Sequence, residues 1–277
     1  MHGHKYIMES DEEVLRLDLK TDEKTVQKQA VWAGIKPGMR VVDLGCGPGK
    51  TTFCLQKLVQ PDSEVVGVDY SEKRLIYAMK HYSGAGIEFI RRDISMPLDD
   101  LGKFDFIWMR FVLEYYRSKG FDIVKNISGI LKPGGILCLI DLDHNCLRYF
   151  GQSKRLERAI CGIMSALEED ADFDPYAGIK LYSYLYDLGY QDIDVDVSLH
   201  HLIFGGLKEK DASNWMMKVE VAAKNSGYGF EEYGGDYKKF FKEVESFLAD
   251  PRRFIYTPLI SCRGRKPLVL NGPEQPF

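Results

Sequence analysis

Residues 41–52 read Val-Val-Asp-Leu-Gly-Cys-Gly-Pro-Gly-Lys-Thr-Thr, an apolar run that ends in glycines at positions 45, 47 and 49. The β-branched residues at its start predict a buried strand, and residues 50–58 after the glycines predict a helix. Glycine has no side chain to block a bound molecule, so this turn lets the backbone pass close under a ligand. In a doubly wound parallel sheet, such turns lie at the carboxyl edge, where nucleotide-like ligands bind.

The spacing of these glycines indicates which ligand the turn suits. A dinucleotide-binding turn reads Gly-x-Gly-x-x-Gly, and here the third glycine comes one residue early. The P-loop pattern is not matched either, because Gly45 and the Gly49-Lys50-Thr51 run are one residue too close. Asp43 would repel a pyrophosphate and attract a cation. The turn therefore favours a ligand that carries positive charge.

The strand-then-helix order continues beyond this turn. Further strands are predicted over residues 64–69, 87–94, 104–109 and 136–141, with helical stretches between them. Nearly continuous apolar strands that alternate with helices are typical of a parallel sheet covered on both faces. Two later strands, 193–204 and 254–262, complete a predicted seven-stranded, mostly parallel sheet of Rossmann-like, doubly wound α/β type.

The predicted domain spans residues 21–266, after an N-terminal cap segment over 1–20 and before a flexible tail over 267–277. Helical insertions are predicted at about 145–175 and 206–250. Both are rich in aromatic residues and methionine, which predicts a helical lid with an apolar pocket under it.

Composition excludes several classes of protein. The chain has 277 residues, 45% of them hydrophobic, and a net charge of -4, which argues against a nucleic-acid binder. Its apolar runs are shorter than the ~18 residues of a membrane span, and the N-terminus lacks the apolar core of a secretory signal. The six cysteines form no Cys-x-x-Cys pair, which favours structural thiols in a reduced, cytoplasmic protein without a metal site.

Residues 41–52 resemble motif I of the class I S-adenosylmethionine-dependent methyltransferases, in the ubiquinone/menaquinone-type branch that acts on small molecules. The resemblance continues through Asp69, Asp93 and the Leu-Lys-Pro-Gly-Gly run at 131–135, and it covers roughly residues 25–145. It implies that S-adenosyl-L-methionine is the cofactor and that its methyl group passes to a small or medium organic metabolite.

The same resemblance implies roles for individual residues. Gly45 and Gly47 would lie under the cofactor, and the charge of Asp43 would favour its ammonium and sulfonium groups. The ribose hydroxyls would donate hydrogen bonds to Asp69. The cofactor-binding residues expected are Asp43, Gly45, Cys46, Gly47, Asp69, Tyr70, Asp93, Ile94 and Arg110.

A candidate general base follows the fifth strand at the same sheet edge. His144 there can take a proton from an acceptor, although a base is needed only where the nucleophile is protonated. Tyr115 stands where the resembling branch commonly has histidine. The Asn/Asp-Pro-Pro-Tyr/Phe signature of enzymes that methylate amino groups of adenine or cytosine is absent from the sequence.

Three other functions stay open at this point. One is a binding module for S-adenosylmethionine without turnover, and another is a methyltransferase that acts on protein or RNA. The third is a nicotinamide oxidoreductase, against which the early third glycine argues. The sequence decides neither the acceptor atom nor the oligomeric state.

Overall fold

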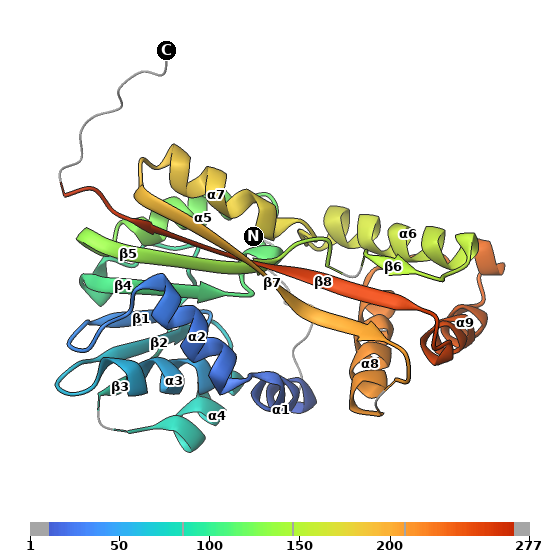
Figure 1. Ribbon diagram of the computed structural model, residues 1–277, viewed down its shortest axis with the longest axis horizontal. Coiled ribbons are helices and arrows are strands. Elements are labelled where there is room, and N and C mark those ends of the chain that lie inside the picture. The colour runs from blue at the N-terminus through green and yellow to red at the C-terminus, as the bar shows by residue number, and fades with distance from the viewer. Residues whose placement is uncertain (1–10, 85, 146, 208, 269–277) are drawn as a thin grey trace, which may run out of the picture.

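The computed structural model describes residues 11–84, 86–145, 147–207 and 209–268 (Figure 1). These residues form one eight-stranded sheet in the order β3-β2-β1-β4-β5-β8-β6, and β7 pairs with β8. The strands are β1 (Val41–Leu44), β2 (Val65–Asp69), β3 (Ile87–Arg91), β4 (Phe104–Arg110), β5 (Leu131–Leu142), β6 (Tyr149–Phe150), β7 (Gln191–Phe204) and β8 (Phe254–Arg265). The helices are α1 (Asp11–Lys20), α2 (Glu23–Ala33), α3 (Lys50–Val59), α4 (Glu72–Tyr82), α5 (Gly120–Ser128), α6 (Lys154–Asp170), α7 (Ala177–Asp187), α8 (Glu209–Asn225) and α9 (Tyr237–Ala249).

The predicted doubly wound architecture is confirmed. Strands β3, β2, β1, β4 and β5 pair in parallel, and β8 runs antiparallel between β5 and β7. The described sheet has eight strands where seven are predicted, and the extra strand is β6, which joins Tyr149 to Ile255. A strand of two residues is too short to show an apolar periodicity, so the sequence pattern misses it.

Two apolar clusters lie on opposite faces of the parallel strands. Side chains alternate along a strand, so Val41 faces the α2–α3 side whereas Val42 faces the α5–α7 side. Phe106 and Ile107 of β4 divide between the two faces in the same way. Because both faces are covered, ligands can approach these strands only at the sheet's edges.

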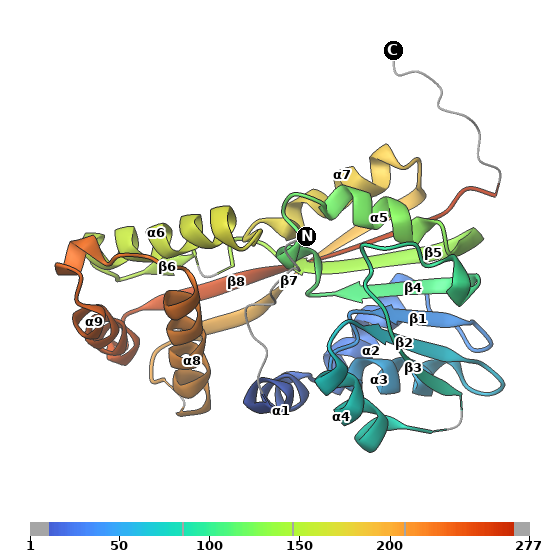
Figure 2. The same ribbon diagram turned by 180° about the vertical axis from the view of Figure 1, so that it is seen from behind.

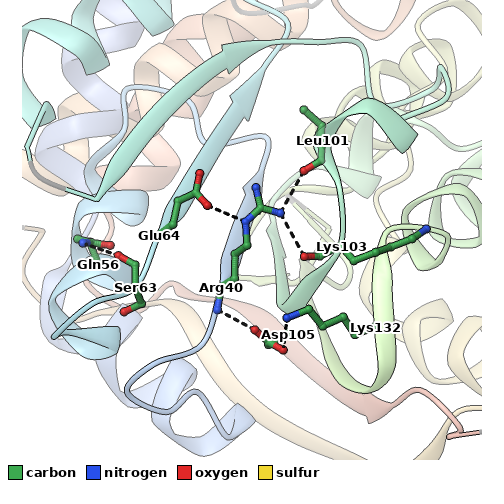
Figure 3. Close-up of polar contacts among 8 residues, drawn as sticks. All are labelled: Arg40, Gln56, Ser63, Glu64, Leu101, Lys103, Asp105 and Lys132. Carbon is green, nitrogen blue, oxygen red and sulfur yellow. Dashed lines mark hydrogen bonds and ion pairs between the residues drawn. The ribbon is translucent and has the colours of Figure 1, made fainter.

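A closed polar network lies at the amino-terminal edge of the parallel strands (Figure 3). The Nε of Arg40 donates to Glu64 at 2.7 Å, and its guanidinium also donates to two backbone carbonyls at 3.1 Å. Asp105 accepts the Arg40 backbone N–H at 2.9 Å and the Lys132 ammonium at 2.8 Å. These groups satisfy one another and tie together the beginnings of four strands, so this edge has a structural role.

Strands β7 and β8 extend well past the parallel strands, and three helices gather on the far part of this antiparallel pair (Figures 1 and 2). We call β6, α6, α8, α9 and these far halves of β7 and β8 the helical lobe. An apolar cluster joins its parts, with Leu156 of α6, Trp215 of α8 and Phe240 of α9 packed around Ile255 of β8. The helices fall in the two segments where helical insertions are predicted.

Candidate functional site

A cavity of about 200 Å³ lies at the carboxyl edge of the parallel strands, between the sheet and the helical lobe. The turn after β1 forms part of its wall, together with Arg110 at the end of β4, Glu114 after β4 and Asn145 after β5. Helix α8 contributes Lys218, Val221 and Ala222, a spacing of three and four residues that lies on one helical face. The cavity is therefore enclosed by segments far apart in sequence.

The three glycines of the turn after β1 serve different purposes. A side chain at Gly45 would collide with Val112, and a Cβ at Gly49 would lie 2.6 Å from the Cβ of Ala78, so both are packing positions. A Cβ at Gly47 would meet no heavy atom within 4 Å, and Gly47 lines the cavity. Gly47 thus leaves bare backbone beside open space, as a close-lying ligand requires.

Asp69, at the end of β2, holds this turn in position. It is 6% exposed, and its Oδ2 accepts the backbone N–H of Gly47 at 2.8 Å while Oδ1 accepts that of Ser71 at 2.9 Å. Asp69 is not part of the cavity wall. It fixes the turn after β1 against the start of α4.

The remaining sequence-predicted contacts lie farther along the sheet edge, outside the cavity wall. The Asp93 Oδ1 accepts hydrogen bonds from the backbone N–H and the hydroxyl of Ser95, at 2.9 and 2.7 Å. Tyr70 is 59% exposed, whereas Ile94 is buried at 5%. The structure therefore brings Asp43, Gly45, Cys46, Gly47 and Arg110 together at the cavity, and Asp69, Tyr70, Asp93 and Ile94 beside it.

A buried pair of opposite charges marks the cavity's sheet side. Burial is the main cause that raises the pKa of Asp43 to about 7; the Thr52 hydroxyl at 2.7 Å opposes the rise, the nearby Asp69 carboxylate adds to it, and Arg110 opposes it. Burial lowers the pKa of Arg110 to about 10, against the attraction of Asp43 and Asp141. Arg110 Nε has no hydrogen-bond partner among the residues the structure describes. A charged ligand bound at this wall would therefore change the pKa values of Asp43 and Arg110.

Sequence reasoning missed a second carboxyl group in the cavity. Glu114, in the short 3-10 helix Leu113–Tyr115, is 5% exposed and accepts a hydrogen bond from Asn145 Nδ2 at 2.9 Å. Burial raises its pKa, and Lys218 opposes the rise. The one available signal was an acid just after the predicted fourth strand, since nothing in the sequence pairs residue 114 with residue 145.

His144 lies next to the cavity but not on its wall. Its Nδ1 is 2.7 Å from the Asp143 Oδ2, and its Nε2 is 2.7 Å from a guanidinium nitrogen of Arg148. Both ring nitrogens are thus engaged in this structure. The neighbouring residue, Asn145, is the one that lines the cavity.

The described residues offer neither a metal-binding cluster nor a membrane-spanning helix. Groups of three or more His, Cys, Asp or Glu side chains that could hold a metal ion were not found among them. In the same residues, every helix is too short or too polar to cross a membrane.

Comparison with known proteins bears mainly on the first half of the chain. Residues 42–139 match a family model described as a methyltransferase domain. The demethylmenaquinone methyltransferase of Lactococcus lactis is 32% identical over 123 residues, which are 43% of this chain and 48% of that protein. The chain thus aligns with about half the length of this curated relative. The family match ends before the helical lobe begins.

Solved structures resemble the chain over a longer stretch, at low identity. Phosphoethanolamine N-methyltransferase 2 of Haemonchus contortus, in complex with S-adenosyl-L-methionine, is 14% identical with a TM-score of 0.57, covering 93% of this chain and 57% of that one. The [4+2]-cyclase SpnF is 17% identical with a TM-score of 0.53, covering 89% and 82%. At these identities the likeness shows the fold alone.

Proposed function

We propose that the chain transfers a methyl group from S-adenosyl-L-methionine to a small or medium organic acceptor, and the match of residues 42–139 to a methyltransferase domain model supports this. The observation that carries this proposal is the cavity wall where the buried Asp43 adjoins the bare backbone of Gly47. A carboxylate beside open backbone suits a cationic ligand and disfavours a pyrophosphate. A cytoplasmic location and the absence of a nucleic-acid partner are part of the same proposal.

The residues present fit this cofactor. Asp43 would attract its positively charged groups, and the turn from Gly45 to Gly47 would lie under it. Asp69, Tyr70, Asp93 and Ile94 continue along the sheet edge, where the ribose and adenine would extend. When bound, the cofactor supplies a methyl group on a sulfonium, and transfer of that group chiefly requires alignment and the exclusion of water.

The other walls of the cavity suit an organic acceptor. Met164, Leu167 and Phe173 are buried and give it an apolar side. Glu114 and Asn145 supply polar groups there. Because burial raises its pKa, Glu114 would accept a proton from the acceptor more readily than an exposed carboxylate would. In this proposal Glu114 replaces His144 as the candidate base.

We expect the affinity for S-adenosyl-L-methionine to fall as the pH drops from 8 to 5. The pKa of Asp43 is about 7, so at acid pH a cationic ligand must displace a proton from it. The limit of this linkage is roughly tenfold in affinity per pH unit. Asp43→Asn keeps an oxygen for the Thr52 hydroxyl, and should bind weakly with little pH dependence over this range. Calorimetric titration at four pH values measures the affinity of the wild type and of Asp43→Asn. If the affinity of the variant changed with pH as steeply as that of the wild type, the role of Asp43 would be contradicted.

Gly47→Val is expected to weaken S-adenosylhomocysteine binding at least a hundredfold, because its side chain would fill the space beside the turn. Gly38→Val is the matched control. Both glycines have a positive φ, 54° at Gly47 and 82° at Gly38, and at neither position would an added Cβ have another heavy atom within 4 Å. Both variants should lose similar stability, about 1 kcal/mol, from strained backbone. Equal cofactor affinities in the two variants would contradict the position given to the cofactor.

The proposed activity is tested with S-adenosylmethionine labelled in its methyl group and a fractionated pool of small metabolites. We expect label in an organic product with the wild-type chain, and at least a hundredfold less with Gly47→Val. Binding of the cofactor without any labelled product would indicate a binding module. Label in protein or RNA alone would move the acceptor to another class.

A further inference from the structure

A second cavity, of about 440 Å³, lies on the other side of Arg110 and His200. Together with Lys20, these two residues line both cavities and lie between them. The second cavity is bounded by α2 and the antiparallel pair β7–β8, and neither Gly47 nor Glu114 lines it. Its volume lies within the range of about 300–1,000 Å³ that is usual for small-molecule sites.

One face of α2 and one irregular stretch of β7 form the walls. Thr25, Lys28, Gln29 and Trp32 line the cavity at the spacing of a single helical face. On β7, the pairing passes from Leu199 with Pro258 to His201 with Thr257, so β7 carries one extra residue. Such a bulge re-aims side chains, and the rings of His200 and His201 lie 4.1 Å apart beside the cavity.

Gln29 is the unusual member of this wall. It is 6% exposed on a helix whose buried positions otherwise include Val26, Ala30 and Ala33. Neither its amide nitrogen nor its amide oxygen has a hydrogen-bond partner among the described residues. A buried polar group left unpaired destabilises the fold, because it has lost its hydrogen bonds to water without replacement. An apolar residue of similar size would avoid this cost.

Three further polar atoms on the wall share this condition. Trp215 Nε1, His201 Nδ1 and Arg110 Nε are buried without a hydrogen-bond partner in the described part of the chain. The indole, the guanidinium and the Gln29 amide are N–H donors, so together they suit a ligand that presents oxygen acceptors.

Charge and shape narrow the class of ligand. Arg110 and the exposed Lys28 favour a negative group. Of the acids at this cavity, Asp22 caps α2 by accepting hydrogen bonds from Thr25, and Asp196 is exposed. The indole rings of Trp32 and Trp215 line the cavity, and an aromatic ligand can pack against them.

We propose that this second cavity is a binding site for a small aromatic carboxylate, with Gln29, Trp215 and Arg110 donating hydrogen bonds to its oxygens. Lys20, Arg110 and His200 lie between this ligand and the cavity proposed for methyl transfer. The ligand is therefore not the methyl acceptor, and the site stands whether or not the proposed function holds.

The test uses 2-naphthoate as the probe, titrated against the full chain by calorimetry and by tryptophan fluorescence. We expect saturable binding of one molecule per chain, both without and with saturating S-adenosylhomocysteine. The ammonium analogue 2-naphthylmethylammonium should bind at least tenfold more weakly. Absence of saturable binding, displacement by S-adenosylhomocysteine, or equal binding of the cationic analogue would each overturn the proposal.

Gln29→Met separates a binding role from a structural one, because methionine has a similar size and no amide. We expect 2-naphthoate affinity to fall at least tenfold, while the melting temperature without the probe stays equal or rises. Gln27→Met, on the same helix and on neither cavity wall, should leave the affinity unchanged. Unchanged affinity in Gln29→Met, or a lowered melting temperature, would show that Gln29 serves the fold instead.

Discussion

Asp69→Ala is expected to lower the affinity for S-adenosylhomocysteine at least a hundredfold and to cost the fold several kcal/mol. The substitution removes the acceptor of two buried backbone N–H groups, those of Gly47 and Ser71. Hydrogen bonds to charged groups contribute about 1.5–3 kcal/mol each, so about 3–6 kcal/mol of unfolding free energy is at stake. Denaturant unfolding and calorimetric titration measure the two losses separately.

Asp69→Asn is the matched variant for this test, because its amide keeps one acceptor oxygen. One of the two backbone hydrogen bonds can then persist, and the stability loss should be about half. The cofactor affinity should also lie between those of the wild type and Asp69→Ala. Wild-type stability in Asp69→Ala would contradict the role assigned to this carboxylate.

Ala222→Phe is expected to reduce methyl transfer at least a hundredfold while S-adenosylhomocysteine affinity stays within tenfold. Ala222 lines the first cavity from α8, so a phenyl ring there would occupy space proposed for the acceptor. The rate is measured with the acceptor found by the labelled-methyl assay. Met217→Phe, on the same helix at a 40% exposed position, is the control and should keep its activity.

Two results would contradict this division of the cavity. Loss of S-adenosylhomocysteine binding in Ala222→Phe would assign α8 to the cofactor. Full activity in the same variant would show that the acceptor binds elsewhere.

Local sequence signals predict the parallel half of the fold well. Most of the parallel strands contain nearly continuous apolar runs, and glycines or capping residues such as Ser71 mark where the next helix begins. The prediction starts the fifth strand too late, because the Lys132-Pro133-Gly134-Gly135 run reads as a break. In the structure, Gly134 N–H donates to the Lys266 carbonyl, and Lys266 N–H donates to that of Gly135. Pairing with a distant segment overrides the local preference there.

In the candidate site, too, the sequence predicts residues that are close together in the chain and misses those that meet only through the fold. Asp43 and the glycines are contiguous, so their pattern is visible in the sequence, whereas Glu114 and Asn145 meet only because β4 and β5 are neighbours. The sequence finds the end of β5 to within one residue. The sequence does not show which of the residues just after β5 lines the cavity, and in the structure it is Asn145 and not His144. Likewise, no local sequence pattern predicts the bulge in β7, where both His200 and His201 line the second cavity.

The central claim is that the turn from Gly45 to Gly47 binds the S-adenosyl cofactor. The most direct measurement is a calorimetric titration of the full chain at pH 8, with S-adenosylhomocysteine and NAD in parallel. The account predicts one saturable site for S-adenosylhomocysteine, no heat of binding with NAD, and loss of the first signal in Gly47→Val. Binding of NAD without binding of S-adenosylhomocysteine would contradict it.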